Sequence, residues 1–155
     1  MSNTYRPGTI GVLTDEYEKA IEELKTVLKG LTAKQFTAVK DKSAYKSFQT
    51  AKGVTEHILY CGFRYSNFIR KKFKNKTTRN KIAVASVDDA IAQLDKMFQH
   101  TLDTFSDKWE MTYTEMLNTI IKTSWATYDM ESMIEHAIVH VLRHRRQIER
   151  LTGSR

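Results

Sequence analysis

The stretch Glu135-His136-Ala137-Ile138-Val139-His140-Val141-Leu142-Arg143-His144 repeats histidine every four residues. Residues four apart lie on the same side of a helix, so the stretch predicts an α-helix with imidazoles along it. Asp129 is a favourable N-cap residue, and the helical pattern continues from there to about Leu151. The residues expected on the inward face of this helix are Met133, Ala137, His140, His144 and Leu151.

Three segments upstream show the same helical spacing of apolar residues. The first is expected to begin near Thr14 and to end at Gly30, and the second to cover about residues 51–73. Ser86, with Asp89 three residues later, predicts the start of a third long helix. The chain has one Pro and six Gly, so helix breakers are few. Four long helices with one apolar face each predict an all-α four-helix bundle.

The connections carry weaker patterns. Residues 32–36 predict a short helical turn after the first helix. The segment from Trp109 to Tyr128 is expected to be an irregular crossover with one helical turn and a locally extended stretch at residues 111–114. The length of 155 residues is that of one domain with a substantial core.

Composition excludes several classes of protein. With 41% hydrophobic and 28% charged residues, the chain has the balance of an ordinary globular protein, and it lacks the run of about 20 apolar residues that a membrane span needs. Residues 1–6 have none of the features of a secretory signal. The single Cys61 cannot form an internal disulfide, so we expect a cytoplasmic protein.

The net charge of +7 leaves nucleic acid open as a partner. The positive charges gather near the C-terminal ends of predicted helices, where the helix dipole favours cations, so we favour a solvated face over a nucleic-acid site. The two clusters are Arg70, Lys71, Lys72, Lys74, Lys76, Arg79 and Lys81, and then Arg143, Arg145, Arg146 and Arg150.

A fourth histidine lies on the apolar face of the second helix. His57 shares that face with Ile58, Cys61 and Tyr65, so it is expected to point inward like His140 and His144. An unpaired buried polar group costs about 1–3 kcal/mol, and three imidazoles on facing helices are hard to satisfy with protein groups alone. Two interpretations stay open, a hydrogen-bonded histidine cluster and a metal site.

Three nitrogen ligands would leave one coordination position open, as in catalytic zinc sites. Nickel, iron and copper also accept three imidazoles. His136 could be a fourth ligand, but we favour a role as a hydrogen-bonding neighbour of the ligands or no role, since successive four-residue steps drift around the helix. Cys61 is expected to be a small buried hydrophobe.

The stretch His140-Val141-Leu142-Arg143-His144-Arg145-Arg146-Gln147-Ile148 resembles the closing motif of the DinB/YfiT-like family, in which two histidines four apart are followed by Gln and an aliphatic residue. Residues 47–60, which contain Thr55-Glu56-His57-Ile58-Leu59, are similar to the family's second helix with its single metal histidine. The opening helix and Leu31-Thr32-Ala33-Lys34-Gln35-Phe36 are similar to the family's start.

The resemblance implies that residues 1–155 form one DinB-like four-helix-bundle domain in up-down-down-up order, with a long crossover before the last helix. It places the metal ligands on His57, His140 and His144. It also implies a divalent transition metal, zinc or nickel, in a protein that forms a homodimer. Activities in the wider family include thiol-dependent S-transfer and isomerisation with low-molecular-weight thiols.

The leading hypothesis is therefore a metal-dependent transferase or hydrolase with an unidentified small-molecule substrate. Hydrolysis needs a nearby proton acceptor, for which the candidates close to the ligands in sequence are Glu56, Tyr60, Tyr128 and Glu131. Two alternatives stay open: a stress-related bundle that binds metal without catalysis, and, less favoured, a basic helical protein that binds nucleic acid.

Overall fold

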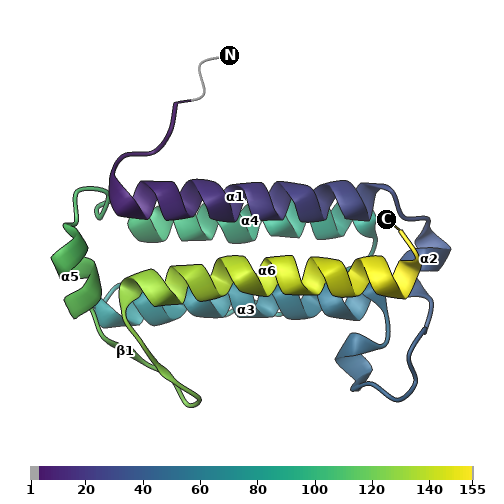
Figure 1. Ribbon diagram of the computed structural model, residues 1–155. Helices are drawn as coiled ribbons and strands as arrows, with labels where there is room; N and C mark the ends of the chain where they lie inside the picture. Colours follow the sequence, from purple (N-terminus) through teal and green to yellow (C-terminus); the bar gives the residue numbers. More distant parts are fainter. Residues whose placement is uncertain (1–3, 155) are drawn as a thin grey trace.

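The computed structural model describes residues 4–154. Residues 1–3, which belong to the stretch considered for a secretory signal, and residue 155 lie outside this range. Within it, four long helices lie side by side: α1 (Gly8–Lys29), α3 (Ala51–Lys72), α4 (Val87–Phe105) and α6 (Met130–Thr152) (Figure 1). The expectation of an all-α protein is confirmed. None of the helices in residues 4–154 combines the length and apolar character needed to cross a membrane.

Short elements fill the connections. Helix α2 (Ala33–Thr37) and the 3₁₀ helix η1 (Lys46–Phe48) lie between α1 and α3. Helix α5 (Tyr113–Asn118) lies between α4 and α6, followed by strands β1 (Ile121–Lys122) and β2 (Thr127–Tyr128). The two strands pair antiparallel as a small hairpin, which places Ile121 opposite Tyr128.

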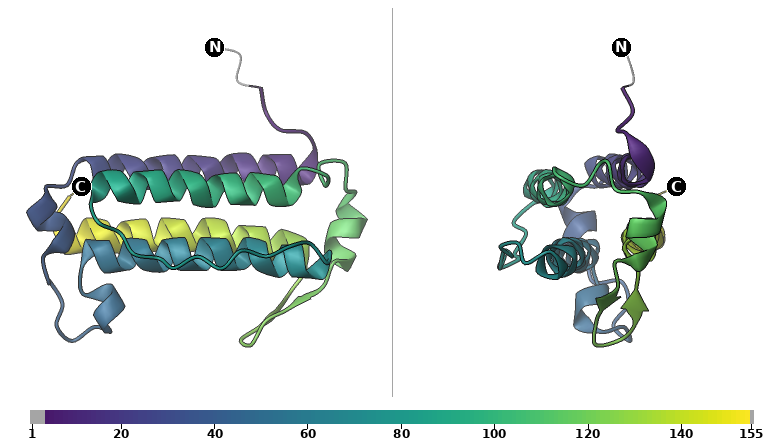
Figure 2. Two further views of the ribbon diagram at one scale, coloured as in Figure 1. Left: turned by 180° about the vertical axis from the view of Figure 1, so that it is seen from behind. Right: turned by 90° about the vertical axis from the view of Figure 1, so that its left-hand side faces the viewer.

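The core lies between the four long helices. Helix α1 packs against α4 and α6, and α3 packs against the same two helices. The end-on view in Figure 2 shows the four helices arranged around a common interior. Their inward faces are apolar at helical spacing, so each helix buries one stripe against two neighbours. Fully buried members of this core are Leu24, Leu28, Val54, Leu59, Leu94, Met97 and Met133.

Two of the long helices, α4 and α6, begin at the capping residues predicted from the sequence. The Ser86 side chain accepts a hydrogen bond from the backbone N–H of Asp89 at the start of α4. The Asp89 carboxylate reaches back to the N–H of Ala85 at 2.8 Å. Asp129 and Ser132 form a capping box that begins α6. These N-terminal N–H groups have no partner within the helix, and the caps satisfy them.

The start of α1 differs from the prediction. The helix begins at Gly8, and Thr14 lies inside it, fully buried. The Thr14 hydroxyl donates a hydrogen bond of 2.7 Å to the carbonyl of Ile10, four residues earlier. A threonine that satisfies its hydroxyl in this way is tolerated within a helix, so it does not mark the helix start.

The connection before the last helix, residues 106–129, is long as predicted, but the connection that runs along the helices lies between α3 and α4. Residues 73–86 run along the length of α3 (Figure 2, left), because α3 and α4 both begin at the end of the molecule that carries α2. Two consecutive helices that run the same way need a connection about as long as a helix. Asn67 holds this connection by two hydrogen bonds to the backbone of Thr78.

The segment from Trp109 to Tyr128 spans one end of the molecule, from the end of α4 to the start of α6 (Figure 1). It is more regular than predicted. Thr112 forms a capping box with Glu115, so α5 begins in the stretch that was expected to be extended. A side-chain hydroxyl that accepts a backbone N–H favours a helix start at that point.

Candidate metal centre

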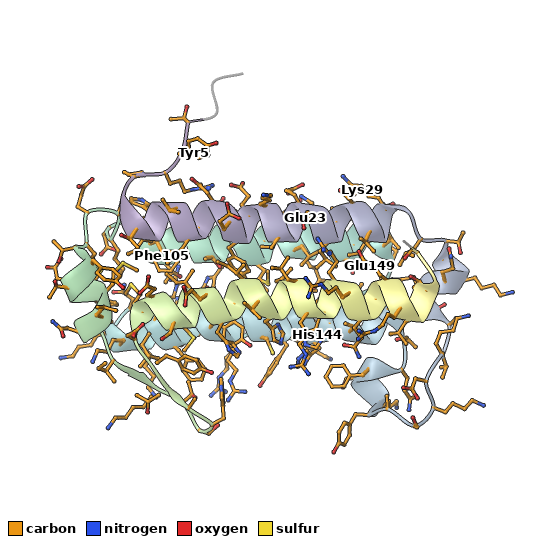
Figure 3. The ribbon with its side chains drawn as sticks, in the orientation of Figure 1. Tyr5, Glu23, Lys29, Phe105, His144 and Glu149 are labelled. Atoms are coloured by element: carbon orange, nitrogen blue, oxygen red, sulfur yellow. The ribbon has the colours of Figure 1, made fainter. Side chains whose placement is uncertain are left out.

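The packing of α3 against α6 brings three histidines together. The ligand nitrogens of His57, His140 and His144 all lie within 4.8 Å of one another. His57 Nε2 is 3.1 Å from His140 Nε2. Figure 3 shows His144 at the edge of the α3/α6 pair from which η1 projects. The three sequence-predicted ligand positions therefore meet at one point, although 83 residues separate His57 from His140.

Burial keeps these imidazoles neutral. His144 is buried, and His57 and His140 are half-buried. Burial, followed by the neighbouring imidazoles, lowers the pKa of His57 to about 4 and of His140 to about 3. Burial also lowers the pKa of His144. At neutral pH the rings therefore offer uncharged nitrogen lone pairs, which is the form that binds metal ions.

Two neighbours orient the rings. Gln147, one turn after His144 on α6, places Oε1 2.8 Å from His144 Nδ1. An amide oxygen can only accept, so His144 donates from Nδ1 and keeps its lone pair on Nε2. Phe48 of η1 stacks on His144 with ring centroids 5.7 Å apart and meets His57 edge-on at 4.9 Å.

The donor set fits a divalent ion. A tetrahedral ion with nitrogens about 2.0–2.1 Å away holds those nitrogens about 3.3 Å apart, close to the separation of His57 and His140 Nε2. A hydrogen bond could satisfy that one pair, with a proton on one of the two rings. The third ring, His144, has its Nδ1 satisfied by Gln147 and its Nε2 free for the shared point. Three neutral imidazoles suit zinc, nickel, copper or iron.

His136 and Cys61 stand beside this group without joining it. The His136 ring contacts Tyr65 and Tyr128, at centroid distances of 5.2 and 5.4 Å, and lies 6.2 Å from the ring of His140. Cys61 Sγ is 3.7 Å from His57 Nε2. The Cys61 side chain packs against the core, and burial raises the pKa of its thiol, which keeps it protonated.

Two of the four predicted proton acceptors, Tyr128 and Glu56, differ in whether they lie near the histidine cluster. The Tyr128 ring packs on His136, and its hydroxyl accepts a hydrogen bond of 2.8 Å from Trp125 Nε1. Glu56 turns the other way, since its carboxylate accepts from the backbone of Val84 in the α3–α4 connection. Of this pair, only Tyr128 reaches the histidine cluster, and it does so through His136.

The other two candidates also lie apart from the cluster. Tyr60 is 52% exposed and lies beside the guanidinium of Arg64. Glu131, in the first turn of α6, hydrogen-bonds Tyr113 of α5 and thereby raises the pKa of that phenol. Within residues 4–154, neither forms a hydrogen bond, an ion pair or a ring-stacking contact with His57, His140 or His144.

Three residues contact the cluster in roles that the sequence analysis did not assign to them. Gln147 had a detectable signal, because three-residue spacing places it next to His144 on a helix. Tyr65 shares the apolar face of His57, and its ring meets His140 at a centroid distance of 5.6 Å. Phe48 had no signal, because it reaches the site from a loop element that local patterns do not place.

The basic clusters are partly engaged within the protein. Arg70 donates from Nε to the Thr104 hydroxyl at 2.7 Å, which joins α3 to α4. Arg145 forms an ion pair with Glu23 of α1, and Figure 3 shows Glu23 at the side of α1 that faces α6. These contacts support the interpretation of the clusters as structural and solvated faces.

One of three comparisons with known proteins found a match for this chain. Searches of curated proteins and of solved structures found no match. A family model described as "DinB family" matches residues 1–152. That range includes all four long helices and the three clustered histidines. The chain therefore belongs to the DinB family.

Proposed function

We propose that this protein is a metal-dependent enzyme of the DinB/YfiT type, in which His57, His140 and His144 hold one divalent ion. The observation that carries the proposal is the convergence of three imidazole nitrogens from α3 and α6 to within 4.8 Å. Three protein ligands leave a position for substrate, whereas structural zinc sites are closed by four.

The surrounding residues prepare the ligands for this role. Burial keeps the three rings uncharged at neutral pH. Gln147 fixes the orientation of His144 by its hydrogen bond to Nδ1, and such contacts raise the affinity of ligating histidines. Phe48 covers part of the cluster and keeps water from that side. An ion bound here supplies a Lewis acid that lowers the pKa of a coordinated thiol or water.

The reaction we propose is a thiol-dependent S-transfer or a hydrolysis, both of which require removal of a proton. His136 is suited to accept it, because burial lowers its pKa and leaves the imidazole neutral at pH 7. Its ring lies beside His140 and against Tyr128. A base must come within hydrogen-bond reach of the proton it takes, directly or through one water.

Family membership supports further proposals. We propose zinc or nickel as the ion, a low-molecular-weight thiol as cosubstrate, and a homodimer as the assembly. We also propose that residues 1–155 form a single four-helix bundle of up-down-down-up order, in agreement with the helix directions in Figure 1. The cytoplasmic location expected from the sequence stays a prediction.

Metal analysis of the purified protein tests the central proposal. We expect about one ion per chain in the wild type and a loss of bound metal in His140→Asn, because two imidazoles hold an ion much less tightly than three. His100→Asn is the matched control, since His100 lies on α4 beside Asn67 and Phe63. Equal metal content in His140→Asn and the wild type would overturn the proposal.

Activity is tested on the same proteins. The metal-loaded wild type is assayed with a panel of small thiols and an electrophilic chlorodinitrobenzene, and with ester substrates. Turnover that disappears in His140→Asn and persists in His100→Asn supports an enzyme. Bound metal without turnover on any substrate of the panel counts against the enzyme and favours a passive metal-binding protein.

A further inference from the structure

Arg64 lies on the same face of α3 as the metal-site histidine. It follows His57 by seven residues and Cys61 by three, which are helical spacings for one face. Its guanidinium carbon lies over three aromatic rings: 4.8 Å from the ring centre of Trp125, 5.4 Å from that of Phe68 and 5.9 Å from that of Tyr60. The rings hold the cation in place at the edge of the site.

Arg64 forms no ion pair, in contrast to four other cations in residues 4–154. Arg6, Lys25, Lys108 and Arg145 each form an ion pair. No Asp or Glu in residues 4–154 forms an ion pair with Arg64. A guanidinium stacked through its flat face still directs N–H donors from its edge, in a fork that matches a carboxylate.

Two of the three rings that contact Arg64 are open to solvent, while Phe68 packs against the core. Tyr60 is 52% exposed and Trp125 is 45% exposed. Two large aromatic side chains this exposed, with an unpaired cation between them, have the composition of a small-molecule subsite.

Aromatic contacts connect this subsite to the histidine cluster. Trp125 lies in the β1–β2 hairpin and donates from Nε1 to the hydroxyl of Tyr128. Tyr128 packs on His136, which neighbours His140. The hairpin and η1 both project from the same side of the α3/α6 pair (Figure 1). The histidine cluster lies toward η1, where Phe48 contacts it, and Arg64 lies toward the hairpin.

We propose that Arg64, held by Tyr60, Phe68 and Trp125, binds the carboxylate of a small molecule whose other end reaches the metal centre. This inference rests on the proposed function and names the substrate class of the same site. Seven residues of helix correspond to about 10 Å along α3, so the carboxylate and the metal-binding group should be separated by a chain of several atoms.

The test uses the cobalt(II)-loaded protein and two thiols that differ only in charge, 6-mercaptohexanoate and 6-mercaptohexanol. Binding is followed by the sulfur-to-cobalt charge-transfer absorption at low ionic strength. We expect the wild type to bind the carboxylate about ten-fold more tightly than the alcohol, the effect of one charge-assisted hydrogen-bonded pair. The carboxylate of mercaptoacetate is too close to its sulfur to reach Arg64 from the metal. Arg64 should therefore give no ten-fold gain in affinity for this thiol.

Arg64→Met retains the apolar bulk and removes the charge. We expect it to bind both six-carbon thiols with the affinity that the wild type shows for the alcohol, while cobalt content and thermal unfolding stay unchanged. Arg64→Lys keeps the charge without the fork and should keep only part of the preference. Arg146→Met, at an exposed position on α6, controls for net charge and should behave as the wild type.

Each outcome decides the question. Loss of the preference in Arg64→Met, but not in Arg146→Met, supports the subsite. Three results would overturn the subsite: equal affinity of the wild type for the two thiols, binding of neither thiol, or a preference that survives Arg64→Met. In each case, cobalt bound to the protein would still support the metal centre. Failure of the wild type to bind cobalt overturns the metal centre and, with it, this inference.

Discussion

At the scale of single residues, the three clustered imidazoles differ in what holds them. His144 is buried and is fixed through Nδ1 by Gln147. His57 and His140 are fixed mainly by ring contacts, with Phe48 against His57 and Tyr65 against His140. A hydrogen bond sets which nitrogen carries the proton, whereas a ring contact sets only the plane. We therefore expect His144 to be the ligand whose orientation is easiest to disturb by mutation of a neighbour.

Gln147→Leu should weaken metal binding about 10- to 100-fold, because His144 loses the acceptor that directs its free lone pair toward the other two rings. Competition against a chromogenic chelator measures the affinity. Gln147→Glu is the control, since it keeps an acceptor at the same position. If Gln147→Leu binds metal as tightly as Gln147→Glu, the hydrogen bond has no orienting role.

At the scale of elements, close approach of α3 and α4 depends on a glycine. Gly62 is buried in the middle of α3, and a Cβ placed there would lie 2.0 Å from Sδ of Met97 on α4. Met97 is fully buried, so its side chain has little room to move. The same helix carries His57 and Arg64, so a shift of α3 relative to α4 would also move these two side chains.

Gly62→Ala should lower the free energy of unfolding, because overpacking costs about 1–3 kcal/mol and exceeds the helix-propensity gain of about 1 kcal/mol. Urea unfolding measures the change. Gly30→Ala serves as the control, since the nearest atom to its new Cβ would be the Val27 carbonyl oxygen at 3.4 Å and its φ of −77° suits alanine. A Gly62→Ala protein as stable as the wild type would show that Met97 moves aside freely.

At the scale of the whole molecule, the histidine cluster joins two segments far apart in the chain. Helix α3 and helix α6 pack along their lengths, and the cluster sits between them. Three neutral imidazoles held at one point make folding sensitive to protons, because the unfolded chain binds protons near pH 6.5 and the folded protein does so only at lower pH. Stability, metal binding and pH are therefore linked.

The metal-free protein should lose stability as the pH falls from 7 to 5. The pKa of His57 is about 4 and that of His140 about 3 in the folded protein, so their stabilisation is complete above about pH 6.5 and is lost as the pH falls toward those values. Because both rings are partly exposed to solvent, we expect a loss of only about 1–2 kcal/mol by pH 5.

Urea unfolding of the chelator-treated protein at pH 7 and pH 5 measures this loss. His140→Asn should show a smaller difference between the two pH values, because one of the groups with a lowered pKa is gone. An equal difference in the wild type and in His140→Asn would place the pH dependence elsewhere in the molecule.

Much of the fold was predictable because it is local. The starts of α4 and α6 follow from the caps Ser86 and Asp129, and the extent of α3 follows from its apolar spacing. The start of α1 was missed, because the local pattern cannot tell a capping Thr14 from one that hydrogen-bonds back within a helix. The connection that runs along the helices between α3 and α4 was also missed, since it depends on which ends of α3 and α4 are neighbours in space.

For the candidate site too, some features could be predicted from local sequence and others could not. The sequence by itself determined that His140 and His144 share a helix face and that His57 points inward, because helical geometry fixes the direction of a side chain relative to its close neighbours. Only the tertiary structure decided that the three nitrogens meet, that Phe48 covers them, and that Trp125 of the hairpin closes over Arg64. Those contacts join residues far apart in the chain, and their positions follow from how whole helices and loops pack, which no local pattern encodes.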